Sequence, residues 1–213
     1  MPVIFYGKVT FRSLKGHVSI VGNVSTAMIR VGIKDQYVDT NCQECIWTIN
    51  GTMTFSGKVK MFRGSYILVA ENAELSLGGN MVLGSGIKLL CFENIRIGST
   101  IRVAWECQIF DTSFHYIEML NKDEKYSKLY SPVIIGDRVW VGNRTTISKG
   151  SVIPNDTIVA SNSLVNKDFS EIEPYSMLVG VPAKPKIAGV KRIFDRKLER
   201  ELDKFYSYPR TKL

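Results

Sequence analysis

Histidine and cysteine are scarce in this sequence, with two and four residues among 213. Four cysteines are too few for a disulfide scaffold in a chain of this length, so we expect a reducing compartment. Cys42 and Cys45 form one CxxC pair, but a structural zinc site needs two further cysteine or histidine ligands nearby, and the other candidates are scattered. We therefore expect no metal, and the role of the CxxC pair stays open.

Long hydrophobic runs are also missing. No apolar stretch approaches the roughly 18–20 residues that a membrane-spanning helix needs. Near the start of the chain, Lys8, Arg12 and Lys15 interrupt the apolar residues, which is unlike a secretory signal peptide. Seven prolines, 17 glycines and 45% hydrophobic residues exclude the collagen-like and disordered classes. These features predict a cytoplasmic globular protein with one large core.

Positive charge is concentrated at one end of the chain. The formal net charge is +8, and residues 184–213 contribute +6 of it through ten basic and four acidic residues. Within this stretch Phe194, Leu198, Leu202 and Phe205 recur at helical spacing, which predicts a short amphipathic helix that closes the fold or docks on a neighbouring chain. Such a basic face is most often solvated; a peripheral contact of the tail with an anionic membrane is the alternative. The aromatic residues lie mostly on the apolar helical face, so we expect no nucleic acid partner.

The middle of the chain contains a strict repeat. Between residues 135 and 165 an aliphatic residue recurs at every sixth position, and a small or β-branched residue follows four positions after each of the first five. The aliphatic positions are Ile135, Val141, Ile147, Ile153, Val159 and Val165. Upstream, sides of six and eight residues give a period of 20, as at Val69, Leu89 and Ile109. Helical stripes recur every three or four residues, so this spacing predicts short strands joined by turns, three to a coil, in a parallel β-helix.

These repeats, together with three longer segments, resemble the hexapeptide-repeat acyltransferases, and in particular the sugar O-acetyltransferases of bacterial polysaccharide and capsule pathways. The segments are VAWECQIFDTSFH (103–115), SPVIIGDRVWVGN (131–143) and VNKDFSEIEPYSMLVGVPAKPK (165–186). The resemblance implies an all-β fold, a left-handed parallel β-helix, although the general rule for parallel crossovers favours the right hand. The β-helix domain would cover residues 57–189. Residues 1–56 would form irregular first coils or a cap, and residues 190–213 a basic C-terminal helix and tail.

The repeat breaks once, between Ile117 and Ile135, which predicts a polar, tyrosine-bearing loop at residues 118–134. His115 precedes this loop at the position that Ile95 occupies one period earlier, so we expect a buried imidazole there. On that ground alone a hydrogen-bonded core histidine and a functional one are equally good interpretations. The sequence DTSFH, which ends at His115, matches the family's pattern of an aspartate four residues before its catalytic histidine, and the resemblance implies that His115 is the catalytic base.

The resemblance implies roles for further residues. Asp111 would orient the imidazole or bind acceptor hydroxyls, and the alternative is a turn aspartate that caps its own backbone. Trp140 stands at an outward position, where it would form a wall of the acceptor or pantetheine site or contact another subunit. Cys107 occupies a small-residue corner position, and direct attack on the thioester needs no acyl-enzyme, so we expect no nucleophilic role for it.

The resemblance also places the coenzyme. Its pantetheine arm would lie along a coil edge near Asn143 and Ser161, held largely by backbone amides. Lys167 and Lys184 would meet the nucleotide end, where a cation pairs well with a ribose phosphate. The chain departs from the usual pattern at Asn166, where the family commonly has threonine. The family forms homotrimers with active sites shared between subunits, and we expect the same here.

We therefore expect an acetyl-CoA-dependent O-acetyltransferase in which a sugar hydroxyl attacks the thioester directly in a ternary complex. His115 would act as the general base, and a backbone N–H would hold the oxyanion. The acceptor would be a sugar or a lipid-linked saccharide. Two alternatives are N-acetylation of an amino sugar nucleotide, although no GxGxxG opens a nucleotide-binding domain, and a non-catalytic β-helix scaffold or carbohydrate-binding module.

Overall fold

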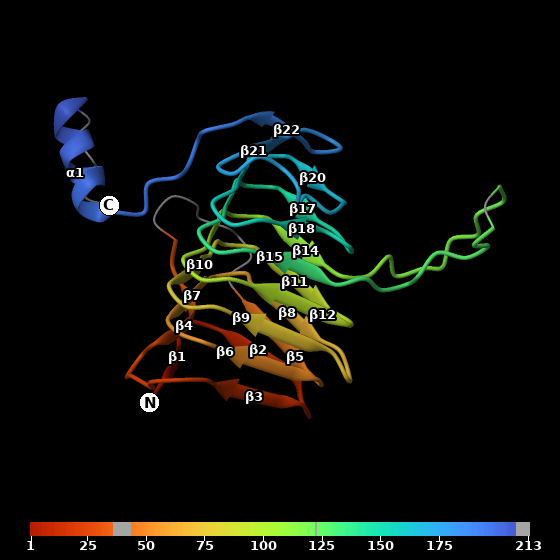
Figure 1. Cartoon of the computed structure of the whole chain (residues 1–213). Coiled ribbons are helices and arrows are strands. Elements are labelled where there is room, and N and C mark those ends of the chain that lie inside the picture. Colours follow the sequence, from red (N-terminus) through yellow and green to blue (C-terminus); the bar gives the residue numbers. More distant parts are fainter. Residues whose placement is uncertain (36–43, 122, 208–213) are drawn as a thin grey trace.

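In the computed structural model, which describes residues 1–35, 44–121 and 123–207, the chain winds into a three-sided parallel β-helix (Figure 1). Each regular coil contributes one short strand to each of three sheets, named sheets A, B and C in the order in which the chain visits them. The strands pair with their counterparts one coil above and one coil below, in parallel register. The predicted all-β parallel β-helix is confirmed.

Sheet A has nine strands, all parallel except the last pair. They are β1 (Val3–Phe5), β4 (Ile29–Ile33), β7 (Val59–Phe62), β10 (Met81–Leu83), β13 (Arg102–Val103), β16 (Trp140–Val141), β19 (Ile158–Val159), β21 (Met177–Val179) and β22 (Lys184–Ile187).

Sheets B and C have seven and six strands. Sheet B consists of β2 (Val9–Leu14), β5 (Cys45–Ile49), β8 (Tyr66–Val69), β11 (Lys88–Cys91), β14 (Gln108–Phe110), β17 (Thr146–Ile147) and β20 (Leu164–Val165). Sheet C consists of β3 (His17–Ile20), β6 (Thr52–Phe55), β9 (Glu74–Leu77), β12 (Asn94–Ile97), β15 (Val133–Ile135) and β18 (Val152–Ile153).

The predicted inward positions form the core. Each aliphatic residue of the repeat between residues 135 and 165 is at most 2% exposed, and so is each small residue at the corners. Those corner residues are Val139, Thr145, Ser151, Thr157 and Ser163. Their hydroxyls stay paired although they are buried: Thr145 Oγ1 donates to the Ala160 carbonyl at 3.0 Å, and Ser151 Oγ donates to the Val165 carbonyl at 3.0 Å.

The three edges of the prism are the A–B corner (turns at 104–107, 142–145 and 160–163), the B–C corner (148–151) and the C–A corner (98–101, 136–139 and 154–157). At the corners the residue before the small one adopts a left-handed backbone, with φ of +55° at Arg138 and +57° at Arg144. Each such turn bends the chain from one sheet to the next.

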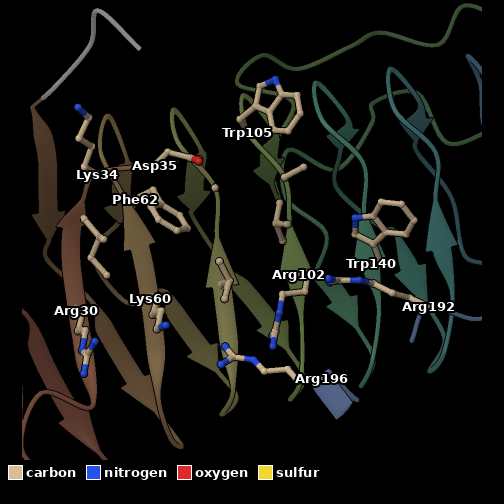
Figure 2. Close-up of a pocket in the computed structure, with 15 residues that line it drawn as sticks. Arg30, Lys34, Asp35, Lys60, Phe62, Arg102, Trp105, Trp140, Arg192 and Arg196 are labelled. Atoms are coloured by element: carbon tan, nitrogen blue, oxygen red, sulfur yellow. The ribbon is translucent and has the colours of Figure 1, made fainter. Parts of the chain in front are cut away.

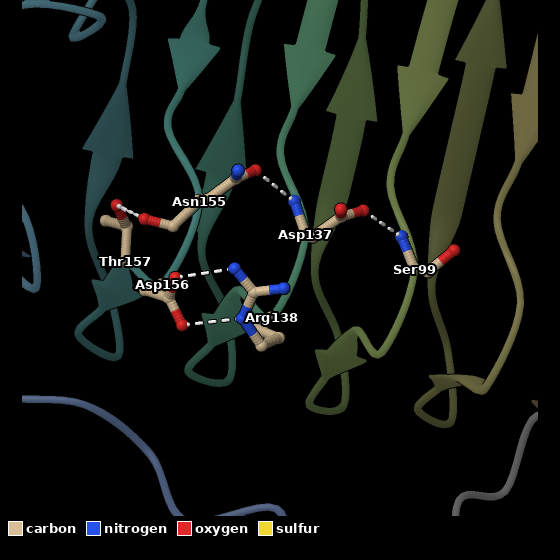
Figure 3. A network of polar contacts seen from close by, with 6 residues as sticks. All are labelled: Ser99, Asp137, Arg138, Asn155, Asp156 and Thr157. Carbon is tan, nitrogen blue, oxygen red and sulfur yellow. Dashed lines mark hydrogen bonds and ion pairs between the residues drawn. The ribbon is translucent and has the colours of Figure 1, made fainter.

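Polar side chains connect successive coils at the C–A corner (Figure 3). Asp137 Oδ1 accepts the Ser99 backbone N–H at 2.6 Å, and Asn155 Oδ1 accepts the Asp137 backbone N–H at 2.7 Å. Beside them Arg138 donates twice to the Asp156 carboxylate, at 2.8 and 2.7 Å, and the Arg138 guanidinium lowers the pKa of that carboxyl group. This corner is occupied by structural contacts.

The N-terminal strands β1 to β6 lie in the same three sheets as the later strands. Of the two interpretations of residues 1–56, irregular coils or a cap, the structure shows coils. Their repeat is hidden in the sequence because the connections are long, as between the end of β4 at Ile33 and the start of β5 at Cys45. Cys42 lies outside the described residues, and Cys45 is buried in the core.

The C-terminal helix α1 (Arg196–Phe205) begins at Asp195, whose carboxylate accepts the Lys197 backbone N–H at 2.7 Å. No residue of α1 is buried, and the helix stands away from the coils (Figure 1). The expectation that it closes the β-helix is wrong. Phe169, Leu178 and Ala183, each at most 3% exposed, cover the last coil instead. Docking of α1 on a neighbouring chain stays a prediction.

We predict that Leu89→Ala lowers the free energy of unfolding by about 2–5 kcal/mol, because Leu89 is fully buried and its removal leaves a cavity. Lys88→Ala, one residue away on the exposed side of β11, should change it by less than about 0.5 kcal/mol. Urea unfolding followed by circular dichroism measures both. Equal effects of the two substitutions would contradict the assignment of inward positions.

Candidate active site

Residues 112–121 and 123–131, between β14 and β15, leave the coil at the B–C corner and project from the prism as the green segment in Figure 1. The two arms pair in antiparallel fashion, with bridges at Thr112–Tyr130 and Glu118–Tyr126. Backbone hydrogen bonds join Ser113 N–H to the Leu129 carbonyl at 2.9 Å. This segment is called the ribbon below. It begins six residues before the start of the predicted loop at 118–134 and ends three residues before the end of that loop. The prediction had the excursion in the right region but at the wrong boundaries.

His115 lies at the base of the ribbon and is exposed. The core position that the sequence assigned to it, beside Ile95, is filled by Val133, which is fully buried. The prediction of a buried imidazole in the coil is wrong because the chain leaves the coil at Thr112, before it reaches His115. The imidazole is therefore open to solvent or to another chain rather than enclosed by its own coil.

Asp111 is fully buried and holds the turn of the preceding coil. Its carboxylate accepts the backbone N–H groups of Phe92 at 2.7 Å and of Glu93 and Asn94 at 2.8 Å. A side chain with no exposed surface is not available to acceptor hydroxyls, so that interpretation is wrong. The turn interpretation is closer, except that Asp111 caps the neighbouring coil and not its own backbone.

Aromatic rings support the base of the ribbon. Phe114 contacts Phe92 edge to face, with ring centroids 5.7 Å apart, and contacts Phe110 at 5.8 Å. Tyr130, from the returning arm, stacks on Phe92 at 6.0 Å. Lys149 Nζ, from the next B–C turn, donates to Ser113 Oγ at 3.0 Å. The sequence analysis missed this cluster, which fixes the backbone on both sides of His115.

The A–B corner brings two predicted coenzyme residues together. Ser161 Oγ donates to Asn143 Oδ1 at 2.6 Å, and Trp105 continues the same column one coil earlier, since its carbonyl accepts the Arg144 backbone N–H at 3.0 Å. Backbones pack closely here: a Cβ atom on Gly142 would lie 2.5 Å from the Ser161 nitrogen. Trp105, Asn143 and Ser161 thus form a continuous edge, called the A–B column below.

The two predicted nucleotide-binding lysines lie near the last coil. Both are exposed, and the Lys167 ammonium group lies 5.0 Å from the centre of the Phe169 ring. Lys167 and Pro185 line one groove of about 410 Å³, and Lys184 is the residue before Pro185 in β22. Their surroundings leave both ammonium groups accessible to an anion.

Trp140 lies on the outer face of sheet A and is 38% exposed. The guanidinium group of Arg192 lies over its ring, 5.6 Å from the centroid. Sheet A is the side of the prism opposite the B–C corner, so Trp140 forms no wall beside the His115 of its own chain. A wall of a site completed by a second chain, or a subunit contact, stays a prediction.

Cys107 is fully buried, and its thiol donates to the Gly142 carbonyl at 3.1 Å. Burial raises the pKa of this thiol to about 11, so it is neutral near pH 7. Both observations support the absence of a nucleophilic role.

Within the described ranges, no three His, Cys, Asp or Glu side chains are grouped so as to hold a metal ion. No helix in the same ranges is long and apolar enough to cross a membrane.

No family model matches this chain. It is 32% identical over 117 residues to a probable acetyltransferase of Mycobacterium tuberculosis, a match that covers 54% of this chain and 37% of that protein. It is 27% identical over 114 residues to a putative lipopolysaccharide biosynthesis O-acetyltransferase of Escherichia coli, covering 49% of this chain and 56% of the other. A third relative, an uncharacterized 24.8 kDa protein from the cps region of Klebsiella pneumoniae, is 29% identical over 177 residues, or 83% and 75% of the two chains. The chain thus spans about a third and about half of the first two relatives.

Among solved structures, the polySia specific acetyltransferase NeuO superposes with a TM-score of 0.55 and 16% identity, over 93% of this chain and 99% of that one. The chain therefore has the left-handed β-helix fold, and the predicted handedness is confirmed. The resemblance seen in the sequence is confirmed as well, since two of these relatives are described as a probable and a putative acetyltransferase.

We predict that Asp111→Ala destabilises the fold by roughly 3 kcal/mol, because it leaves three backbone N–H groups of a part-buried turn without their acceptor. Asp137→Ala removes a single such acceptor at a partly exposed corner and should cost about 1 kcal/mol. Urea unfolding of both variants measures the difference. A loss for Asp111→Ala no larger than for Asp137→Ala would contradict this role.

Proposed function

We propose that the protein is an acetyl-CoA-dependent O-acetyltransferase that acetylates a sugar hydroxyl, with His115 as the general base. Two observations support this proposal: His115 is exposed on a ribbon whose base is packed by aromatic rings, and the A–B column lies on another edge of the prism. The sequence similarity to acetyltransferases gives the reaction class.

The chemistry needs one proton carrier and no covalent enzyme intermediate. The acceptor hydroxyl loses its proton to the neutral imidazole of His115 as its oxygen attacks the thioester carbonyl. The C–S bond then breaks, and the imidazolium returns the proton to the coenzyme A thiolate. A backbone N–H of the A–B column would stabilise the oxyanion between these steps. Lys167 and Lys184 would pair with the phosphates of the nucleotide end.

The two halves of this site lie on different edges of one chain. His115 is at the B–C corner and the A–B column is at the other end of sheet B, so one full side of the prism separates them. That side is about six residues of nearly extended chain, or roughly 15–20 Å. Three copies around a threefold axis would bring the B–C corner of one chain beside the A–B corner of the next. We therefore propose a homotrimer with three shared sites, in which α1 docks on a neighbouring chain.

The substrate side of the proposal is coarser. A sugar or lipid-linked saccharide is the proposed acceptor, and the putative lipopolysaccharide and galactoside O-acetyltransferases among the relatives support this class. Because acetyl-CoA is produced inside cells, we place the reaction in the cytoplasm. Asp111 is buried and would not contact the acceptor, and Trp140 would lie near the His115 of a second chain and not that of its own.

Acetyl-CoA binding tests the first requirement without knowledge of the acceptor. Isothermal titration should give one site per chain, and Lys167→Ala with Lys184→Ala should weaken it by about tenfold, since charge-assisted phosphate contacts are lost. Lys125→Ala, on the outer part of the ribbon, is the matched control and should bind as the native protein does. Absence of saturable binding up to millimolar acetyl-CoA would reject the acetyltransferase.

Subunit complementation tests the shared site. His115→Ala should lower kcat by about 10²–10⁴-fold while acetyl-CoA still binds, because only the proton transfer is lost. Ser161→Trp should block the A–B column and abolish acetyl-CoA binding. Chains carrying one substitution each, refolded together, should regain activity, since some interfaces then pair an intact His115 with an intact Ser161. No recovery in mixed oligomers, verified by size and composition, would place the whole site in one chain.

A further inference from the structure

A groove of about 530 Å³ lies on the outer face of sheet A (Figure 2). Its lining is strongly basic. Arg30, Lys60 and Arg102 project from the strands, Arg192 comes from the segment that leads into α1, and Arg196 is the first residue of α1. The lining also includes Lys34 and one carboxylate, that of Asp35. Trp105 and Trp140 also line the groove. The proposed acetyl transfer assigns no task to these cations.

The three sheet cations occupy a single outward row. Arg30 pairs in register with Lys60, and Lys60 is connected through Val82 to Arg102. Neighbouring strands lie about 4.8 Å apart, so the backbone positions of these cations are separated by roughly 5 and 10 Å along the prism axis. The row continues to Trp140. Such a row can bind a chain that carries anions at intervals.

The other two faces lack this concentration of charge. The corresponding row of sheet B holds one cation, Lys88. The corresponding row of sheet C also holds one, Arg96. A general preference for lysine and arginine on solvated faces would have placed them on all three sheets. The outward row of sheet A therefore has an excess of basic side chains over the equivalent rows of sheets B and C.

The cations of the groove are poorly neutralised by the protein. Among the described residues, none of the five forms an ion pair with a carboxylate. Partial burial, followed by repulsion from neighbouring cations of the groove, lowers the pKa of both Lys60 and Arg102. Glu199 acts in the opposite direction on Arg102 and Arg192. Like charges held together at this density favour the binding of a polyanion.

The aromatic residues connect the groove with the A–B column. Arg192 packs over Trp140 at 5.6 Å and over Phe194 at 4.9 Å, and these contacts hold its guanidinium group at the edge of the groove. Trp105 lines the groove and is also the first residue of the A–B column. A ligand that follows the cations therefore arrives at the edge where the thioester is proposed to bind.

We propose that this groove binds an acidic saccharide chain, whose carboxylate or phosphate groups pair with Arg30, Lys60 and Arg102 and whose sugar rings pack against Trp105. This inference rests on the proposed function, because it names the acceptor class of the same site. The hydroxyl to be acetylated belongs to the sugar that reaches the A–B column, and the sugars behind it supply the binding energy. The basic C-terminal segment thus serves the acceptor through Arg192 and Arg196.

An acidic saccharide fits better than the two other polyanions. Single-stranded nucleic acid needs successive aromatic platforms for its bases, and here the ring of Trp140 is covered by Arg192. A membrane surface would meet the cations only on a protruding face, whereas these cations lie within a groove on a flat sheet. A saccharide chain is narrow enough to lie along the row and has hydroxyls to present at its end.

Titration of the native protein with defined oligosaccharides tests this proposal. An oligogalacturonate supplies carboxylates, a phosphorylated oligomannoside supplies phosphates, and a maltooligosaccharide of equal length is the neutral control. One or both acidic probes should bind at least about tenfold more tightly than the neutral one, with an affinity that falls as salt rises. Their relative affinities then identify which anion the groove prefers.

Two double variants locate the binding. Lys60→Gln with Arg102→Gln should weaken the acidic probe by about tenfold or more, because two charge-assisted contacts are lost. Lys88→Gln with Arg96→Gln removes the same charge from the equivalent rows of sheets B and C and should change the affinity by less than about twofold. Circular dichroism and unfolding midpoints verify that both proteins are folded.

Acetyl-CoA titrations of the same proteins separate this inference from the proposed function. Loss of saccharide binding with intact acetyl-CoA binding in Lys60→Gln/Arg102→Gln supports the groove. If the native protein binds the acidic probe but not acetyl-CoA, the result supports the saccharide groove and rejects the proposed acetyltransferase activity. Equal affinity for neutral and acidic probes, or an equal loss of affinity in the two double variants, would overturn the proposal that the groove binds an acidic saccharide. So would tighter binding of single-stranded DNA or of phosphatidylserine vesicles through the same residues.

Discussion

The narrow interior of the prism is the constraint on which the rest of this structure depends. A six-residue side of a coil points one aliphatic side chain inward between its corners, and a longer side points two, as at Leu75 and Leu77. Residues such as Leu83 and Leu89 fill the interior and have no exposed surface. In the later coils the corners hold small residues, among which Thr145 and Ser151 donate their hydroxyls to carbonyls of the next coil. Ile87 and Ile101 occupy the same position in earlier coils. Because the interior is full, no ligand can enter it, and every function must be built on the faces and edges.

The three edges of the prism differ in structure. The C–A corner is used for coil-to-coil hydrogen bonds, through Asp137 and Asn155, and for the Arg138–Asp156 ion pair. The B–C corner releases the ribbon that carries His115, and the A–B corner carries the column of Trp105, Asn143 and Ser161. A rigid prism cannot bend to bring two of its edges together. The separation of His115 from the A–B column is therefore a property of the fold, and the proposed site would be completed only by assembly with a second chain.

The sequence predicts the core well and the edges poorly, for one physical reason. Inward positions repeat because each coil imposes the same packing, so a six-residue period reveals them. The repeat misplaces the start of the ribbon because Ile117 follows Ile97 by one full period of 20 residues, as an inward residue would, although its side chain is 55% exposed. The true signal is Asp111, whose buried carboxylate ends the coil. The basic row was invisible because Arg30, Lys60 and Arg102 are separated by 30 and 42 residues in the chain and meet only through register.

The proposed groove and the proposed shared site together connect trimer assembly with the length of the acceptor. Sheet A of one chain ends at its A–B column, and in the proposed trimer the base that serves this column would come from the B–C corner of the next chain. An acidic saccharide bound along Arg30, Lys60 and Arg102 would thus be held by one subunit and deprotonated by another. Binding energy from contacts several coils away would position the reacting hydroxyl against the imidazole and so reduce the entropy cost of the proposed ternary complex. A short acceptor would lack these contacts, so the length of the row favours a polymer over a single sugar.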